Sequence, residues 1–371
     1  MTNPRSPIAR LIDYGQSPWY DNLTRQLIAG GGLAQLMDED GIRGVTSNPT
    51  IFEKAMASGE GYDEQLAELA RAKTPVDSVY WALVLDDIRH AADLFRPTYD
   101  SLDGADGFVS VEVAPDLADD TAATIDQVRW LHGQAARPNV FVKIPATAAG
   151  IPAIEQSLAE GMPINITLIF SLERYAQVIE AYFRGLERHA EEGGDLSRLA
   201  SVASFFVSRV DTEADRRLPE GHPLRGKVAV ANAKLAYKQF RQRFSGPRWE
   251  ALAARGAWLQ RPLWASTSTK NPEYPDTLYV DELIGRDTVN TLAQASIDAY
   301  RDHGNPRPDT IERDVEGAEQ VIRDLAGAGV DYDDLTATLE REGVDSFGRS
   351  YLDCLATLDK RRNELLNPST P

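Results

Sequence analysis

The sequence of 371 residues predicts an α/β protein folded as a (β/α)8 TIM barrel, with helical insertions and a C-terminal helical extension. Short segments rich in β-branched residues alternate with longer helix-like segments, as in parallel strands that helices cover on the outside. In several of these strands, polar side chains also alternate with aliphatic ones. Because alternate side chains share one face of a strand, these polar groups should converge on the barrel interior.

Eight segments have the length and composition of strands. In chain order they are residues 17–21, 44–47, 107–113, 139–145, 163–168, 201–207, 261–267 and 288–292. A sheet with one solvated face would also explain the alternation of polar residues. The helix-like segments between the strands make that alternative weaker, since they imply parallel strands with a covered outer side.

Helix signals lie between the strands. A helix over residues 23–40 is expected to stop at Gly41, and residues 172–191 are rich in helix formers. Residues 53–106 and 210–260 are longer than a simple barrel connection needs. Each of these two stretches is therefore expected to hold more than one helix.

The last section of the chain follows a proline-rich break at residues 305–308. It contains three helical candidates, at residues 314–328, 332–342 and 345–366. The break lacks the length of a flexible linker. We therefore expect one domain over residues 1–371, with the barrel at about 15–304 and a helical tail at about 309–367 packed on it.

The composition narrows the possible partners. A net charge of −18, with no long run of Lys and Arg, argues against nucleic acid or an anionic membrane, although a few local cations could still bind an anionic small molecule. No apolar run approaches the ~18 residues of a membrane span, and residues 1–10 lack the apolar core of a signal peptide. A cytoplasmic protein is expected.

The sequence predicts neither a metal site nor another cofactor. The single cysteine, Cys354, excludes a disulfide framework and is expected to be a buried structural thiol. The five histidines are scattered without ligand spacing.

Lys143 is the most informative residue, because it is a lone amine in the otherwise apolar strand at residues 139–145. Burial disfavours its ammonium form, so it either pairs with a carboxylate or serves as a neutral amine that attacks a carbonyl carbon. The second option is Schiff-base chemistry. A purely structural ion pair stays open as the alternative.

Several other strands place polar or reactive residues two positions apart on one face. These pairs are Trp19 with Asp21, Thr46 with Asn48, Ser110 with Glu112, Asn165 with Thr167, and Ser204 with Phe206.

Four segments, at residues 41–52, 141–146, 164–171 and 203–211, resemble the signature segments of the transaldolase family in its longer bacterial branch. The resemblance covers nearly the whole chain. It implies a metal-independent class I enzyme of the non-oxidative pentose phosphate pathway. Such an enzyme moves a dihydroxyacetone unit from sedoheptulose 7-phosphate or fructose 6-phosphate to glyceraldehyde 3-phosphate or erythrose 4-phosphate.

The resemblance also implies catalytic roles. Lys143 would form the iminium, and Asp21 would take the proton from the C4 hydroxyl and later return one to the acceptor aldehyde. Glu112 and Thr167 would handle a water used in forming and dehydrating the carbinolamine. The alternatives are a helix cap for Asp21, an ion pair with Lys143 for Glu112, and an ordinary strand position for Thr167.

The hydroxyls of the three-carbon unit would be held by Asn48, Asn165 and Ser204, whose groups both donate and accept hydrogen bonds. Asn48 could instead only shape the turn before Pro49. Related fructose 6-phosphate aldolases, which release free dihydroxyacetone, are much shorter and carry Tyr where this chain has Phe206. Both differences favour transfer over that alternative.

The phosphate of a sugar phosphate would meet Arg209 and Ser266, by the same resemblance. The loop after Ser266 departs from the shorter branch of the family because it is longer and lacks an arginine. Lys270 is the expected substitute, with a solvated loop lysine as the alternative. A barrel retained for binding without turnover is a third alternative. It would predict the loss of some reactive residues, but Lys143, Asp21 and Glu112 are all present. A monomer and a homodimer both remain open.

Overall fold

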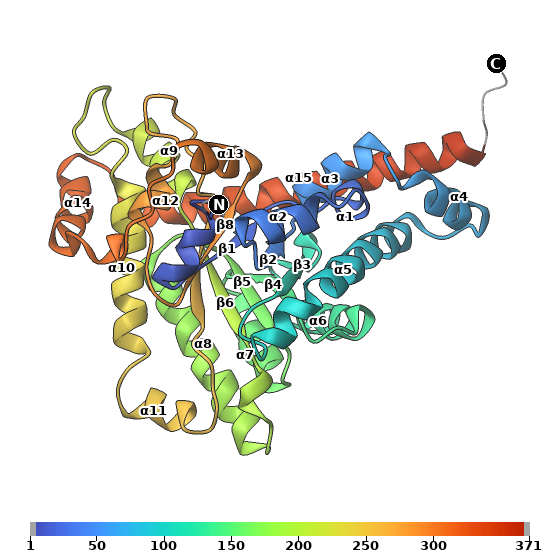
Figure 1. Cartoon of the computed structure of the whole chain (residues 1–371), viewed down its shortest axis with the longest axis horizontal. Helices are drawn as coiled ribbons and strands as arrows, with labels where there is room; N and C mark the ends of the chain where they lie inside the picture. Colours follow the sequence, from blue (N-terminus) through green and yellow to red (C-terminus); the bar gives the residue numbers. More distant parts are fainter. Residues whose placement is uncertain (1–4, 367–371) are drawn as a thin grey trace.

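The computed structural model describes residues 5–366, and its centre is a closed barrel of parallel strands (Figure 1). The strands are β1 (Gln16–Tyr20), β2 (Gly44–Thr46), β3 (Phe108–Glu112), β4 (Val140–Pro145), β5 (Ile164–Ile169), β6 (Ser201–Phe206), β7 (Arg261–Ala265) and β8 (Thr288–Leu292). Each strand pairs in parallel with the next, and β8 pairs with β1 to close the barrel. The predicted fold class and all eight predicted strands are confirmed.

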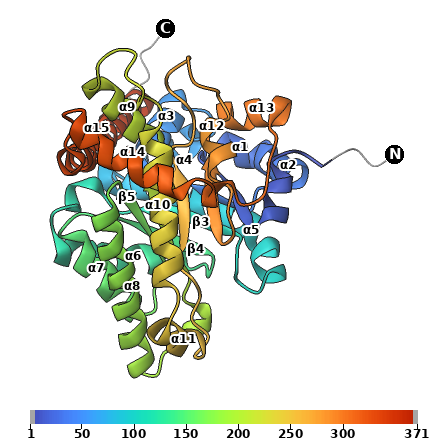
Figure 2. The ribbon, with the colours of Figure 1, turned by 90° about the vertical axis from the view of Figure 1, so that its left-hand side faces the viewer.

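Helices cover the outside of the barrel. They are α1 (Arg25–Ala29), α2 (Gly32–Asp40), α3 (Pro49–Ser58), α4 (Asp63–Arg71), α5 (Val76–Ser101), α6 (Thr121–Ala135), α7 (Gly150–Ala159), α8 (Leu172–Glu191), α9 (Ser208–Arg217), α10 (Val228–Arg243), α11 (Pro247–Ala253), α12 (Leu278–Glu282), α13 (Gln294–His303), α14 (Val315–Gly327) and α15 (Tyr332–Leu366). Four 3-10 helices add to them: Ala9–Tyr14, Pro115–Leu117, Leu196–Arg198 and Thr310–Glu312. Figure 2 shows α8 and α10 along the barrel wall, where they contact each other. Among residues 5–366, no helix is both long enough and apolar enough to cross a membrane.

Two helix predictions were wrong in detail. The predicted helix over residues 23–40 is split into α1 and α2, because Gly31 adopts a left-handed conformation with φ of 77°. The stop at Gly41, which has φ of 68°, is confirmed. The candidates at residues 332–342 and 345–366 form one continuous helix, α15, which runs through Gly343.

Aromatic packing fills one part of the barrel interior. Phe141 stacks on both Trp19 and Phe108, and the ring centroids of Phe108 and Phe141 are 4.1 Å apart. The indole of Trp19 donates a hydrogen bond of 2.8 Å to Asp106, which also pairs with Arg261. The polar interior groups lie farther along the strands, toward their carboxyl ends, where barrel active sites occur.

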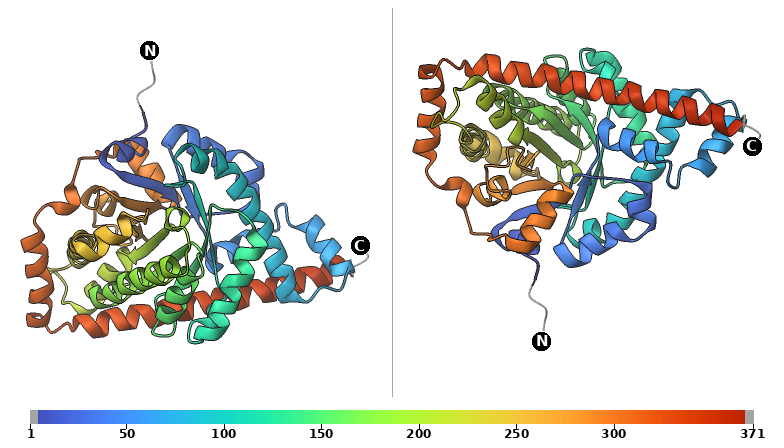
Figure 3. Two further views of the ribbon diagram at one scale, coloured as in Figure 1. Left: turned by 90° about the horizontal axis from the view of Figure 1, so that it is seen from below. Right: turned by 90° about the horizontal axis from the view of Figure 1, so that it is seen from above.

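The C-terminal helix α15 lies across several barrel elements. Figure 3 shows it in red as a straight rod along one side of the molecule. It contacts α3, α4, α5, α9 and the strand β5. Its cysteine, Cys354, is fully buried against Met56 of α3, as the sequence predicts.

Candidate active site

Lys143 and Glu112 lie side by side on β4 and β3, where they are partners in strand register. The Lys143 Nζ donates hydrogen bonds to Glu112 Oε2 at 3.0 Å and to the Ser47 carbonyl oxygen at 3.1 Å. Only 5 % of Lys143 and 7 % of Glu112 is exposed. Burial raises the pKa of the Glu112 carboxyl above its ordinary value, and the Lys143 charge opposes that rise. The pair therefore gives the amine a nearby proton acceptor.

Asp21 follows the last residue of β1 and lines a central cavity of the barrel that Lys143 also lines. Its Oδ1 accepts a hydrogen bond of 2.8 Å from Thr46 Oγ1, and that hydroxyl also contacts the hydroxyl of Thr291. Burial raises the pKa of Asp21, while the Thr46 hydrogen bond and the Lys143 charge oppose the rise. The alternative role of Asp21 as a helix cap is wrong, since Thr24 caps α1. A carboxyl with a raised pKa is suited to both accepting and returning a proton.

A chain of hydrogen bonds crosses the barrel interior through Asn165. The Ser204 hydroxyl donates to Asn165 Oδ1 at 2.7 Å, and Asn165 Nδ2 donates to Ser110 Oγ at 3.0 Å. These contacts fix the orientation of the amide. The Thr167 hydroxyl is buried beside them and has no hydrogen-bond partner among the described residues. A buried hydroxyl in that state is available to a water or a substrate.

Asn48 serves the local turn and the cavity together. Its Oδ1 accepts a hydrogen bond of 3.0 Å from the Ile51 backbone and so caps α3, with Pro49 as the first helical residue. The side chain also lines the central cavity. Its Nδ2 hydrogens are not used by the cap, so they remain free to donate.

Two of the three predicted phosphate ligands line the central cavity of the barrel, and the third lies outside it. Arg209, at the start of α9, lines the central cavity with Phe206, and Ser266 lines it from the end of β7. The Ser266 hydroxyl also hydrogen-bonds that of Ser208 at 2.8 Å. Lys270 lies outside this cavity, with its Nζ donating to Ser268 Oγ at 2.7 Å. Lys270 still interacts electrostatically with Arg209 and Asp21, so it lies near the rim.

The central cavity has a volume of about 80 Å³. It is lined by Asp21, Thr46, Asn48, Lys143, Thr167, Ser204, Phe206, Arg209, Leu263, Ala265, Ser266, Thr291 and Phe347. Eight of the predicted site residues are in this lining. Glu112 and Asn165 lie behind it, hydrogen-bonded to Lys143 and Ser204, which do line it.

Sequence reasoning missed two kinds of lining residue. Thr291 lies on β8, and the pattern of that strand alone does not single it out from Asn290. Phe347 comes from α15, far from the barrel in sequence, where an aromatic residue is indistinguishable from an ordinary core residue. The only sequence signal for Thr46 is that it lies two positions before Asn48, on the same face of the strand.

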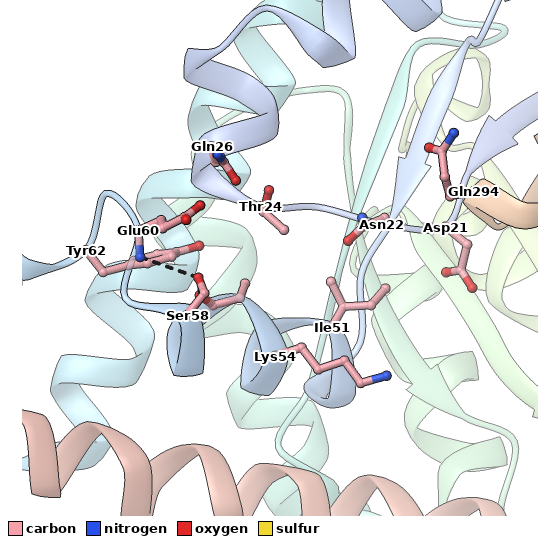
Figure 4. A pocket seen from close by; sticks show the side chains of 11 residues that line it. Asp21, Asn22, Thr24, Gln26, Ile51, Lys54, Ser58, Glu60, Tyr62 and Gln294 are labelled. Atoms are coloured by element: carbon pink, nitrogen blue, oxygen red, sulfur yellow. Dashed lines mark hydrogen bonds between the residues drawn. The ribbon is translucent and has the colours of Figure 1, made fainter.

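A second, more open pocket of about 410 Å³ shares Asp21 with the central cavity (Figure 4). Its other walls come from the segment after β1, from α3, from the turn after α3 and from Gln294 at the start of α13. Figure 4 shows the Lys54 ammonium pointing toward the end of the pocket where Asp21 lies. Lys54 has no ion pair within residues 5–366, and no pattern in the sequence distinguishes it from other exposed lysines. Among residues 5–366, no three His, Cys, Asp or Glu side chains lie close enough together to hold a metal ion.

A parallel barrel with a buried lysine inside it, a carboxylate beside that lysine and a second carboxylate on another strand defines the class of barrels built for Schiff-base chemistry. The chain belongs to the transaldolase/fructose-6-phosphate aldolase family, whose model matches residues 18–358. It is 51 % identical over 366 residues to a transaldolase of Acidothermus cellulolyticus, covering 96 % of this chain and 98 % of the relative. It is also 50 % identical to a transaldolase of Thermobifida fusca, over 94 % of this chain and 96 % of the relative. A transaldolase of Saccharopolyspora erythraea is 49 % identical, over 97 % and 98 % of the two chains.

Proposed function

We propose that the chain is a transaldolase that carries a dihydroxyacetone unit, bound to Lys143, from a ketose phosphate to an aldose phosphate. The family membership and the transaldolases at about half identity over nearly full length support the activity. The observation that carries the residue assignment is the separation of two carboxyls. Glu112 contacts the amine at 3.0 Å, whereas Asp21 lies just after β1 and has its own hydroxyl partner, Thr46.

Imine formation begins with the Lys143–Glu112 pair. Glu112 accepts a proton from the Lys143 ammonium, and the neutral amine attacks the C2 carbonyl of the ketose. The carbinolamine then loses its hydroxyl as water, and a proton from Glu112, passed through a water at the Thr167 hydroxyl, completes that loss. Burial raises the pKa of Glu112, which suits a carboxyl that must both accept a proton and return one.

Carbon–carbon cleavage uses the second carboxyl. Asp21 removes the proton from the C4 hydroxyl, the C3–C4 bond breaks, and its electron pair moves to the iminium nitrogen to give an enamine. The aldose phosphate leaves, and the enamine stays attached to Lys143. Attack on an acceptor aldehyde reverses these steps, with Asp21 returning the proton to the new hydroxyl. Asn165, Ser204 and Asn48 hold the hydroxyls of the retained fragment.

The sugar phosphates are seven- or six-carbon ketose donors and three- or four-carbon aldose acceptors. Arg209 and Ser266 would hold their phosphate in the cavity, with Lys270 adding charge from the rim. We also propose that the chain forms a single domain, that it is cytoplasmic, and that it is a monomer or a homodimer. Contacts of α15 with α3, α9 and β5 support the first of these.

Product analysis tests the function directly. The protein is incubated with fructose 6-phosphate, with and without erythrose 4-phosphate, and every product is identified. Sedoheptulose 7-phosphate that forms only with the acceptor is the expected result. Free dihydroxyacetone without an acceptor would instead identify an aldolase, and no turnover under either condition would indicate a barrel retained for binding.

A further inference from the structure

Arg209 is unusual in carrying a charge into the site without a carboxylate partner. Within residues 5–366 its guanidinium makes no hydrogen bond or ion pair. Instead it lies over two aromatic rings, with its Cζ 5.2 Å from the centroid of Phe206 and 5.9 Å from that of Phe347. Burial lowers the pKa of Arg209, while the carboxylates of Asp21, Glu112 and Glu342 act on it only through space and oppose that change. A desolvated charge ordinarily needs a paired anion, so the rings substitute for one.

The two rings have different origins. Phe206 ends β6 and was singled out by its strand parity, whereas Phe347 belongs to α15 in the C-terminal extension. Phe347 is 4 % exposed and lines the same cavity as Lys143. The extension therefore completes the wall of the active site.

The helix is fixed against the barrel on both sides of Phe347. One turn before it, Gly343 lies so close to Leu168 of β5 that an added Cβ would be 2.9 Å from the Leu168 side chain. Three residues after it, the Ser350 hydroxyl hydrogen-bonds that of Thr50 on α3 at 2.7 Å. Near the N-terminal end of α15, Asp334 pairs with Arg217 of α9 at 2.6 Å. Phe347 is thus held by contacts to β5, α3 and α9.

We propose that Phe347 is a positioning residue that, together with Phe206, holds the Arg209 guanidinium ready for the substrate phosphate. This inference rests on the proposed function, in which Arg209 is the phosphate ligand. A carboxylate partner would occupy the N–H donors of Arg209 and compete with the anion. An aromatic face attracts the cation without using those donors, so they stay free for the paired hydrogen bonds that phosphate favours. The C-terminal extension thereby sets the preference for phosphorylated sugars.

Two substitutions at Phe347 separate the ring from its bulk. Phe347→Leu keeps an apolar side chain but removes the ring face, and Phe347→Tyr keeps the face. Loss of one cation–π contact predicts binding of inorganic phosphate, measured by calorimetry, that is about three- to thirtyfold weaker in Phe347→Leu. The KM for fructose 6-phosphate should rise by a similar factor, with a smaller change in kcat. In Phe347→Tyr, the phosphate affinity and the KM for fructose 6-phosphate should both stay within about twofold of the unsubstituted protein.

Tyr351→Leu is the matched control. Tyr351 lies one turn farther along α15, packs on Tyr80 and does not line the cavity. Its loss tests whether a weakened helix alone reduces phosphate binding, and unchanged binding is expected. In an Arg209→Ala background, Phe347→Leu should have no further effect on phosphate binding, because the group that it positions is gone.

Unchanged phosphate binding in Phe347→Leu would overturn the proposal. So would an equal loss in Tyr351→Leu, or an equal further loss in the Arg209→Ala background. Phosphate binding is measured without turnover. Failure of this inference is therefore distinguishable from failure of the proposed function, which the products of the unsubstituted protein decide.

Discussion

The Nζ of Lys143 lies 3.0 Å from Oε2 of Glu112, and both side chains are almost fully buried on adjacent strands. A buried pair of this kind is weak evidence for stability, because the cost of desolvating both charges offsets their attraction. Its position inside the barrel favours a chemical role. The carboxyl that pairs with the amine at rest is also the group to which the amine can give its proton.

The two carboxyls should serve different steps. Asp21→Asn should still accumulate an imine that borohydride traps, while cleavage slows by about two to four orders of magnitude, the usual effect of losing a positioned acid or base. Glu112→Gln should slow imine formation, because the amine loses its proton acceptor. Rapid-quench measurement of imine formation and aldose release checks both. Loss of the same step in both variants would refute the division of roles.

The proposed phosphate ligands should differ in how strongly they contribute to the use of phosphorylated sugars. Arg209→Ala should reduce kcat/KM for phosphorylated sugars by about tenfold to a few hundredfold, since a guanidinium makes paired, charge-assisted hydrogen bonds. Lys270→Ala should have a smaller effect, because Lys270 lies outside the central cavity. Neither change should alter the use of a non-phosphorylated ketose. Lys360→Ala, at an exposed end of α15, is the control. If Lys270→Ala affects phosphorylated and plain sugars equally, Lys270 is not a phosphate ligand.

Asp211 should make stability depend on pH. It is buried and accepts hydrogen bonds from the Ala229 backbone and the Tyr279 hydroxyl, and burial raises its pKa to about 6. An unfolded aspartate has a pKa of about 3.9, so between about pH 4 and pH 6 the folded state binds more protons at this residue. Its contribution to stability therefore falls as pH rises through that window.

Asp211→Asn removes this effect. The free energy of unfolding of the variant, minus that of the unsubstituted protein, should rise from about pH 4 to pH 6 by at most ~3 kcal/mol and then stay constant. Urea titrations at pH values across this range measure it. A difference that does not change with pH would show that Asp211 is ionised normally.

Gly44 should not tolerate a side chain. An added Cβ would lie 2.5 Å from the Trp19 ring and 2.9 Å from the Phe108 carbonyl oxygen, and the Trp19 ring is held by Asp106. Gly44→Ala should destabilise the protein by about 1–3 kcal/mol, the usual cost of overpacking. Gly133→Ala is the matched control, because nothing lies within 4 Å of its added Cβ in α6. The control should stabilise by about 0.5–1 kcal/mol, and equal melting temperatures for both variants would contradict the steric account.

The barrel was predictable because short strand-like segments alternate with helix-like ones, and because polar and aliphatic residues alternate in several of the strands. Side-chain parity along the strands predicts that Lys143, Asp21 and Thr167 share one interior, and all three line the central cavity. Helix boundaries were less predictable. Gly31 is the middle of three consecutive glycines, residues 30–32, which break a segment that is otherwise rich in helix formers. Gly343, in contrast, lies inside a continuous helix and packs closely on Leu168 despite its weak helix propensity.

Residues that reach the site from distant parts of the chain could not be predicted. The position of Phe347 depends on where α15 crosses the barrel. Lys54 is an exposed lysine that lines a pocket with Asp21 because of where α3 lies. The direction of Lys270 depends on its loop, which no strand or helix period constrains. Local patterns thus predicted the candidate reacting groups, and tertiary packing determines which other groups surround them.

Borohydride trapping with fructose 6-phosphate tests the central claim most directly. Mass spectrometry of the digested adduct should place the reduced three-carbon or six-carbon unit on Lys143, and Lys143→Ala should give neither adduct nor transfer. Lys143→Arg, which keeps a charge beside Glu112, should be equally inactive because a guanidinium does not form the imine. An adduct on another lysine, or full transfer by Lys143→Ala, would contradict the account.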